Sequence, residues 1–171
     1  MGIETSEIIQ RGGLVPDATI VKLIEDWLRL HGAHGFVFDG FPRTVRQAQA
    51  LEVALAELGT PLTAVVKFTI SDTTAIRRII GRFTCPVCKR TYHQEWRPPA
   101  NDQVCDVDGA PLEKRSDEDE LTVKRRLAIY REQTEPLERY YEERGLLRDV
   151  DAEARMDTVT ERMLAALGDA V

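Results

Sequence analysis

The chain has few cysteines, no long apolar run and no excess of basic residues. No apolar stretch approaches the roughly 18 residues that span a bilayer, and no basic start followed by an apolar segment marks a signal peptide. With 29 acidic and 23 basic residues, the formal net charge is −6, which disfavours a nucleic-acid-binding protein. We therefore expect a cytoplasmic protein that binds neither membranes nor nucleic acids.

The three cysteines are an odd number, and all lie between residues 85 and 105, which argues against a disulfide framework. Cys85 and Cys88 form a C-x2-C pair, and Cys105 and Asp108 form a C-x2-D pair. Three thiolates and one carboxylate are ligands that tetrahedral zinc accepts, and a closed set of four is structural. The spacing therefore predicts a structural zinc site, with His93 as an alternative to Asp108 as the fourth ligand.

Short apolar runs alternate with stretches of helical periodicity along the chain. Runs at 36–38, 64–70 and 146–151 predict strands, and apolar residues at helical spacing predict helices over 17–31, 44–58 and 159–167. The alternation predicts an α/β fold with a parallel sheet and helices on both of its faces. A length of 171 residues suits one such domain with a small insert.

Several residues predict where the helices begin and end. Asp17 and Ser71-Asp72 are suited to cap helices, and Gly59 is suited to end one. Asp117 and Glu120 stand at capping-box spacing at the start of a long helix, which Pro136 should bend or interrupt.

One of five arginines lies in the loop after the first predicted strand, and the other four flank a Pro-, Gly- and Cys-rich insert that runs from residue 83 to 113. Two of them are four residues apart, which predicts that they lie on one side of a helix. A hinged insert would bring all five around one cleft. Guanidinium groups bind phosphate through paired hydrogen bonds and keep their charge, so the cluster suits the transfer of a phosphoryl group. The five are Arg43, Arg78, Arg82, Arg115 and Arg126.

Several motifs follow one another in a fixed order over nearly the whole chain. They are Gly13-Leu14-Val15-Pro16-Asp17, Asp39-Gly40-Phe41-Pro42-Arg43-Thr44 with Gln47-Ala48, Arg78-Ile79-Ile80-Gly81-Arg82, Thr91-Tyr92-His93, Arg115 with Asp117-Glu118, Thr122-Val123-Lys124-Arg125-Arg126-Leu127, and Val150-Asp151. In order and spacing the sequence resembles the adenylate kinases, which catalyse ATP + AMP ⇌ 2 ADP with Mg²⁺. The resemblance implies a P-loop NTPase-like three-layer α/β/α fold, with a core and AMP-binding helices at 1–82, a zinc-binding lid at 83–114 and further core at 115–171. It also implies a monomer.

The resemblance assigns roles to individual residues. The five arginines would neutralise the transferred phosphoryl group, Asp39 would act on Mg²⁺ through water, and Asp117 and Glu118 would pair with lid groups on closure. AMP would be bound by Gly13, Leu14, Val15, Gly40, Phe41, Pro42, Arg43, Gln47, Arg115 and Arg126, with Gln47 on the adenine. ATP would be bound by Arg78, Arg82, Thr91, Tyr92 and the main chain at Ala154, and zinc by Cys85, Cys88, Cys105 and Asp108.

One family motif is absent from these 171 residues. Adenylate kinases open with a strand and a glycine-rich phosphate loop, yet G-x-x-x-x-G-K-[ST] occurs nowhere in this sequence. That loop cradles ATP phosphates with backbone N–H groups and a lysine. We therefore expect an N-terminally truncated chain that folds poorly, because strands lose their partners, and that is weakly active or inactive alone. The alternatives are a non-catalytic nucleotide-binding fragment and, less favoured, a zinc-ribbon nucleic-acid module.

Overall fold

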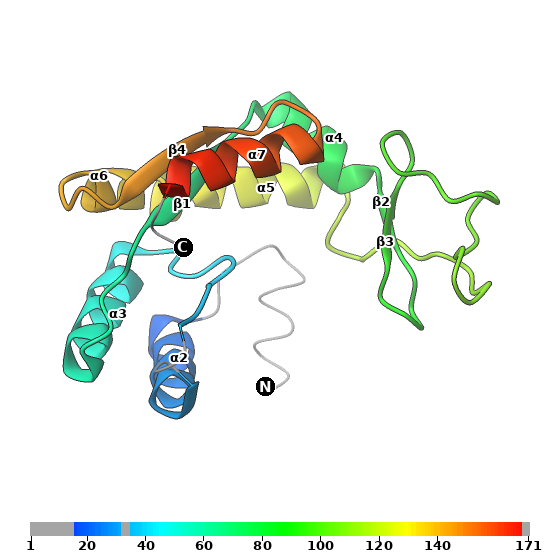
Figure 1. The fold of residues 1–171 in the computed structure, drawn as a ribbon. Coiled ribbons are helices and arrows are strands. Elements are labelled where there is room, and N and C mark those ends of the chain that lie inside the picture. Colours follow the sequence, from blue (N-terminus) through cyan, green and yellow to red (C-terminus); the bar gives the residue numbers. More distant parts are fainter. Residues whose placement is uncertain (1–15, 32–34, 169–171) are drawn as a thin grey trace. The chain divides into compact units, whose positions relative to one another are not determined.

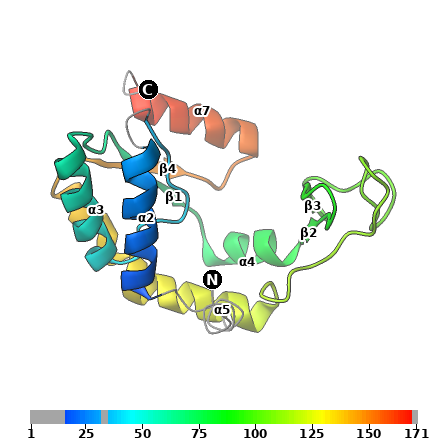
Figure 2. The same ribbon diagram turned by 90° about the horizontal axis from the view of Figure 1, so that it is seen from below.

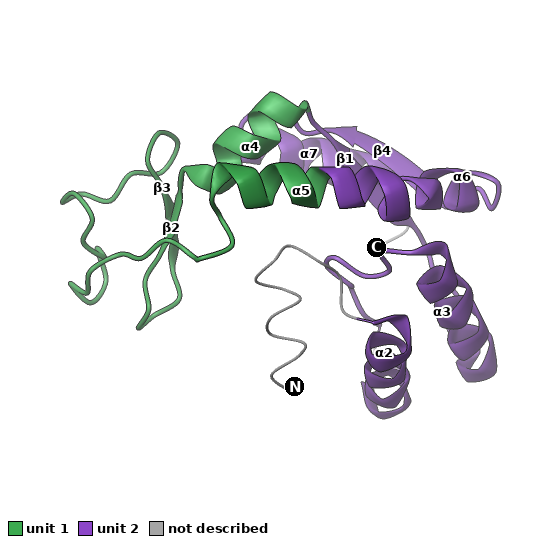
Figure 3. Ribbon diagram, turned by 180° about the vertical axis from the view of Figure 1, so that it is seen from behind, with its two compact units in different colours: residues 1–13, 71–127 green, residues 14–70, 128–171 purple. Residues whose placement is uncertain are grey.

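The computed structural model describes residues 16–31 and 35–168. The chain divides into two compact units, one of residues 1–13 and 71–127 and the other of residues 14–70 and 128–171 (Figure 3). No helix in the described part is both long and apolar enough to cross a membrane. In chain order the elements are α2 (Asp17–His31), α3 (Val45–Leu58), β1 (Val65–Thr69), α4 (Asp72–Ile80), β2 (Arg82–Thr84), β3 (Thr91–His93), α5 (Glu120–Ile129), the π-helix η2 (Tyr130–Thr134), α6 (Pro136–Glu142), β4 (Leu147–Asp151) and α7 (Met156–Leu167) (Figure 1).

The unit of residues 14–70 and 128–171 is built on a parallel pair of strands. β1 pairs with β4, in a register that runs from Val65 opposite Leu147 to Thr69 opposite Asp151. Helix α7 packs along β4, and α6 contacts both β4 and α3 (Figure 2). The parallel pairing predicted for the second and third apolar runs is therefore confirmed. The buried residues of this core are Ala48, Leu137, Tyr140 and Tyr141.

The prediction of a strand at 36–38 is wrong, because this segment takes no strand conformation in the structure. The rings of Phe36 and Phe38 instead pack against each other and against Trp27 of α2. Between them, Val37 is 94% exposed. Alternate residues thus face the core as in a strand, but a strand also needs a neighbour for its backbone N–H and C=O groups, and β1 pairs only with β4 among the described residues.

The predicted ends of the helices are confirmed at α3 and α4 and are wrong at α2. Gly59 ends α3 in the left-handed conformation, and the Ser71 hydroxyl accepts a hydrogen bond from the Thr74 N–H at the start of α4. Asp17 is the first residue of α2 and does not cap it. Its carboxylate instead binds Thr44 and Gln47, which lie outside α2.

The unit of residues 71–127 carries the insert between α4 and α5. A short antiparallel hairpin of β2 and β3 stands at its base, and the isolated bridge Thr84–Glu113 ties the two ends of the insert together. Arg82 begins β2, because α4 ends at Ile80. The prediction that Arg78 and Arg82 share one side of a helix is therefore wrong.

The long helix after the insert begins two residues later than the capping box predicts. α5 starts at Glu120, and the Asp119 carboxylate caps it by accepting a hydrogen bond from the Thr122 N–H at 3.0 Å. The predicted interruption at Pro136 is confirmed, because η2 separates α5 from α6 and Pro136 is the first residue of α6. The late start leaves Asp117 and Glu118 outside the helix and available to other partners.

Candidate metal centre and active site

Four donor groups meet in the insert as the two sequence pairs predict. The sulfurs of Cys85, Cys88 and Cys105 and a carboxylate oxygen of Asp108 all lie within 4.8 Å of one another. The Cys88 and Cys105 sulfurs are 3.5 Å apart, and the Cys85 sulfur is 3.3 Å from Asp108 Oδ2. Ligands on a tetrahedral zinc with bonds of about 2.0–2.3 Å are about 3.5–3.8 Å apart. The Cys88–Cys105 and Cys85–Asp108 separations are therefore close to those in a tetrahedral site, and all four groups lie near enough to share one ion.

The backbone around these four groups suits anionic ligands. The N–H groups of Val87 and Cys88 both point at the Cys85 sulfur at 3.4 Å, and the Val107 N–H points at the Cys105 sulfur at 3.5 Å. A hydrogen bond from the Ala110 N–H, with others from the neighbouring thiols, holds the pKa of Asp108 at about 2. Donors aimed at sulfur stabilise a thiolate, the form that binds metal, so the cluster can hold a metal ion.

His93, the alternative fourth ligand, lies outside this cluster. Its Nδ1 accepts hydrogen bonds from the N–H groups of Glu95 and Trp96, and its Nε2 lies 3.2 Å from the carbonyl oxygen of Arg77. With Nδ1 accepting, Nε2 carries the proton and donates. Both ring nitrogens are thus engaged in fixing the base of the insert to α4.

Tyr92, one of the predicted ATP contacts, is part of the small core beneath the metal cluster. Its side chain is 2% exposed, and its hydroxyl accepts from the Asp106 N–H at 2.8 Å and lies 3.4 Å from the Cys105 sulfur. Only its main chain is therefore left to meet a nucleotide. The neighbouring prediction, Thr91, is exposed at the start of β3.

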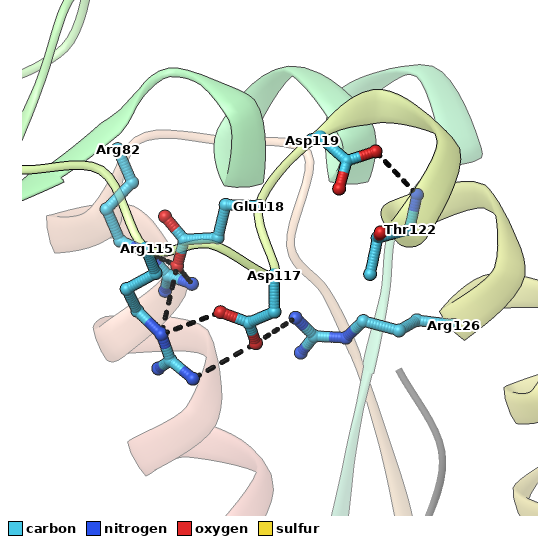
Figure 4. Close-up of polar contacts among 7 residues, drawn as sticks. All are labelled: Arg82, Arg115, Asp117, Glu118, Asp119, Thr122 and Arg126. Atoms are coloured by element: carbon cyan, nitrogen blue, oxygen red, sulfur yellow. Dashed lines mark hydrogen bonds and ion pairs between the residues drawn. The ribbon is translucent and has the colours of Figure 1, made fainter. Parts of the chain in front are cut away.

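Three of the five predicted arginines gather around two buried carboxylates at the start of α5 (Figure 4). Arg82 donates through its Nε to Glu118 Oε1 at 2.9 Å. Arg115 donates two parallel hydrogen bonds to Asp117, at 3.0 and 3.1 Å, and Arg126 reaches the same carboxylate at 3.3 Å. The arginines come from β2, the loop before α5 and α5 itself, so the fold and not the sequence brings them together.

The network is unevenly exposed to solvent. The Glu118 and Asp117 side chains are 1% and 9% exposed, whereas those of Arg82, Arg115 and Arg126 are 35%, 55% and 34% exposed. Each guanidinium group is bound along one edge by a buried carboxylate, and its other N–H groups remain available on the solvent side. Guanidinium groups that are already oriented and partly desolvated can bind the oxygens of a polyphosphate with little further ordering.

Arg78 lies in the same unit, where it contacts an aromatic ring. Its guanidinium lies over the ring of Trp96 at 5.5 Å from the centroid, as does that of Arg77. The same indole stacks on His93, with ring centroids 4.1 Å apart. The aromatic ring of Trp96, which the sequence motifs do not single out, therefore places a cationic group at the base of the insert.

Arg43 belongs to the other unit, in the loop before α3, where the structure shows how its backbone is held. Its N–H donates to Gln47 Oε1 at 2.8 Å, and its own Nε donates to the carbonyl oxygen of Gly40 at 2.6 Å. Gly40 has φ +70°, a conformation that favours glycine. The Gln47 amide is 3% exposed, and its nitrogen donates to Asp17 Oδ1 at 2.8 Å. Both ends of the amide predicted to contact adenine are thus engaged.

The remaining predicted residues are described by their places in the fold. Asp39 is exposed in the loop before α3, and Ala154 lies between β4 and α7, beyond the carboxyl end of β4. Phe41 and Pro42 line the same loop as Arg43, with Phe41 packed against Phe38. Gly13, Leu14 and Val15 lie outside the described residues.

Comparison with known proteins agrees with this geometry. The sequence profile of the family described as Adenylate kinase matches residues 1–146. The chain is 42% identical to the adenylate kinase of Geobacter sulfurreducens over 165 residues, which cover 96% of this chain and 76% of that protein. It is 42% identical to the adenylate kinase of Acidothermus cellulolyticus over 170 residues, covering 98% and 77%. It is 39% identical to that of Methanosarcina barkeri over 168 residues, covering 98% and 78%.

These matches extend over both compact units, including the metal cluster, the arginine network and the loop of Arg43. The α/β architecture around β1 and β4 agrees with the P-loop NTPase-like fold of the matched family. The chain belongs to the adenylate kinase family of phosphotransferases.

Proposed function

We propose that this chain is an adenylate kinase that transfers a phosphoryl group between ATP and AMP, with Mg²⁺ bound to ATP. The observation that supports this most is the convergence of Arg82, Arg115 and Arg126 on Asp117 and Glu118. In phosphoryl transfer the charge spreads over the phosphoryl oxygens, and catalysis consists largely of positioning and charge stabilisation. Three fixed guanidinium groups supply both.

The acceptor side of the reaction is assigned to the loop before α3. The Arg43 guanidinium is exposed and carries a positive charge for the AMP phosphate, while Gly40, Phe41 and Pro42 shape the loop. Gln47 would contact adenine by exchanging one of its present partners, Arg43 or Asp17, for the base. AMP contacts are also proposed for Arg115, Arg126, Gly13, Leu14 and Val15. Of these, Gly13, Leu14 and Val15 lie outside the described residues.

The donor side is assigned to the base of the insert and to the carboxyl end of β4. Arg78, held over Trp96, and Arg82 would face ATP together with Thr91, the Tyr92 main chain and the Ala154 main chain. Asp39 would hold a water ligand of Mg²⁺. Since no G-x-x-x-x-G-K-[ST] occurs in these 171 residues, we expect this polypeptide alone to turn over far more slowly than the Geobacter sulfurreducens enzyme.

We further propose that the ion held by the insert is zinc, bound by Cys85, Cys88, Cys105 and Asp108. Its role is to stabilise residues 83–114, whose own core consists of few buried side chains. Zinc held by four protein ligands has no position left for a substrate. Three thiols that form no disulfide also suit a cytoplasmic protein.

A coupled assay of ADP formation from ATP and AMP, run beside calorimetric titrations of each nucleotide, tests the proposal. We expect binding of both nucleotides, slow turnover, and a loss of about 10²–10³-fold in kcat when Arg126 is replaced by Met. Arg126→Lys should not restore the rate, because lysine cannot make paired hydrogen bonds. Binding without turnover would favour the non-catalytic alternative, and binding of neither nucleotide would overturn the proposal.

A further inference from the structure

We propose that Thr134, the last residue of η2, is a positioning residue that holds the loop of Arg43 for the acceptor phosphate. The Thr134 hydroxyl donates a hydrogen bond of 2.8 Å to the carbonyl oxygen of Arg43, 91 residues earlier in the chain. Both residues belong to the unit of residues 14–70 and 128–171. The inference rests on the proposed function of Arg43 as the ligand of the AMP phosphate.

Thr134 and Gln47 together bind both backbone polar groups of Arg43. On one side the Arg43 N–H donates to the buried Gln47 amide at 2.8 Å, and on the other the Arg43 carbonyl accepts from Thr134. The next residue, Thr44, is fixed as well, since it caps α3 and donates to Asp17 at 3.2 Å. With both its N–H and its C=O bound, the backbone of Arg43 has a fixed orientation although its guanidinium is exposed.

The π-helix is what gives the Thr134 hydroxyl this position. The Glu135 N–H bonds to the carbonyl of Tyr130 at 2.8 Å, one residue further back than in an α-helix. Pro136 has no N–H, and its ring would clash with the carbonyl four residues earlier in a continuous α-helix. The extra residue rotates the following helix by about 100° relative to an uninterrupted one. Single π turns of this kind are frequent at functional sites.

Both sides of the contact are anchored in one core. Leu137, Tyr140 and Tyr141 of α6 and Ala48 of α3 form a single buried cluster. Thr134 lies three residues before Leu137, and Arg43 lies five residues before Ala48, so neither end can drift far from the other. The hydroxyl therefore sets the position of the Arg43 loop and does not serve to hold α3 and α6 together.

The test compares Thr134→Val with Thr134→Ser and with a matched control, Thr60→Val. The Thr60 hydroxyl, which is buried in this unit, has no hydrogen-bond partner, so the same change of atoms there removes no hydrogen bond. AMP and ATP affinities are measured by calorimetry on the full chain, and the rate of tryptic cleavage between Arg43 and Thr44 is followed by mass spectrometry without nucleotide.

We expect Thr134→Val to weaken AMP binding about five- to tenfold, to leave ATP binding unchanged and to speed cleavage after Arg43. Thr134→Ser and Thr60→Val should behave as wild type. Unchanged cleavage and AMP affinity in Thr134→Val, or equal losses in Thr134→Ser, would overturn the inference. If the wild-type chain binds no AMP, the proposed function fails, and the cleavage rates alone decide whether Thr134 holds the loop.

Discussion

Glu118 binds Arg82 through one carboxylate oxygen only. Oε1 accepts from Nε of Arg82 at 2.9 Å, while Oε2 is buried and has no hydrogen-bond partner. A buried charged oxygen without a partner costs free energy, and the fold retains it beside the arginines proposed to bind phosphate. The position of Glu118 is thus better explained by orienting Arg82 than by stabilising the chain.

Replacing Glu118 by Gln should therefore have a larger effect on nucleotide binding than on folding. The amide keeps an oxygen for Arg82 but loses the charge, and we expect a loss of about 1–2 kcal/mol in unfolding free energy by chemical denaturation. ATP affinity should fall more than AMP affinity, because Arg82 is assigned to the donor. Glu113→Gln changes an exposed carboxylate of the same segment and should alter neither quantity.

Metal removal should affect the insert and spare the unit of residues 14–70 and 128–171. Metal analysis of purified protein should find about one zinc per chain. A chelator should raise hydrogen exchange and tryptic cleavage within residues 83–114, where the metal is proposed to act. Asp108→Ala should retain less zinc and His93→Ala as much as wild type, since both His93 nitrogens have other partners. A folded, metal-free protein would contradict the zinc assignment.

Gly81 should tolerate no side chain while His93 is present. A Cβ at Gly81 would lie 2.4 Å from Nε2 and 2.6 Å from Cε1 of the His93 ring, which is itself buried. We expect Gly81→Ala to cost about 2 kcal/mol in unfolding free energy. In the double variant with His93→Ala the two losses should be less than additive. Strict additivity in a thermal or denaturant melt would show that the contact is not the cause.

The buried Tyr141 side chain should make the free energy of unfolding fall at alkaline pH. Burial, with the nearby Tyr140 and Glu52, raises the pKa of Tyr141 to about 12, above the value of about 10 for an unfolded chain. The unfolded state then loses its proton first, so stability should fall from about pH 10 and go on falling up to about pH 12.

Tyr141→Phe isolates this effect in equilibrium denaturation from pH 8 to 12. The variant should lose less stability in that interval than wild type. Because the Tyr141 hydroxyl is buried without a partner, the variant should equal wild type at pH 8 or exceed it by about 1 kcal/mol. Parallel pH curves for the two proteins would refute the assignment.

Local features of the sequence predict much of this fold correctly. The C-x2-C and C-x2-D pairs meet in the structure, Gly59 ends α3, Ser71 caps α4 and Pro136 interrupts the long helix. The helix ends depend on neighbours within a few residues, where spacing and backbone preference suffice. Each ligand pair is likewise local in sequence, although the two pairs meet from positions 17 to 23 residues apart. The errors share a different cause. Residues 36–38 pair with no strand in the described part of the chain, Arg82 follows the end of α4, and Asp17 binds residues some 30 positions away.

What the sequence by itself determined is therefore the family, the metal-ligand pairs and the identity of the arginines, because these are properties of residue type and order. Only the tertiary structure decided which groups hold one another. It placed Asp117 and Glu118 under three arginines, engaged both ends of the Gln47 amide, and brought the Thr134 hydroxyl to the carbonyl of Arg43. Such contacts join segments far apart in the chain, and they are fixed by helix ends and by a π turn that residue type alone does not reveal.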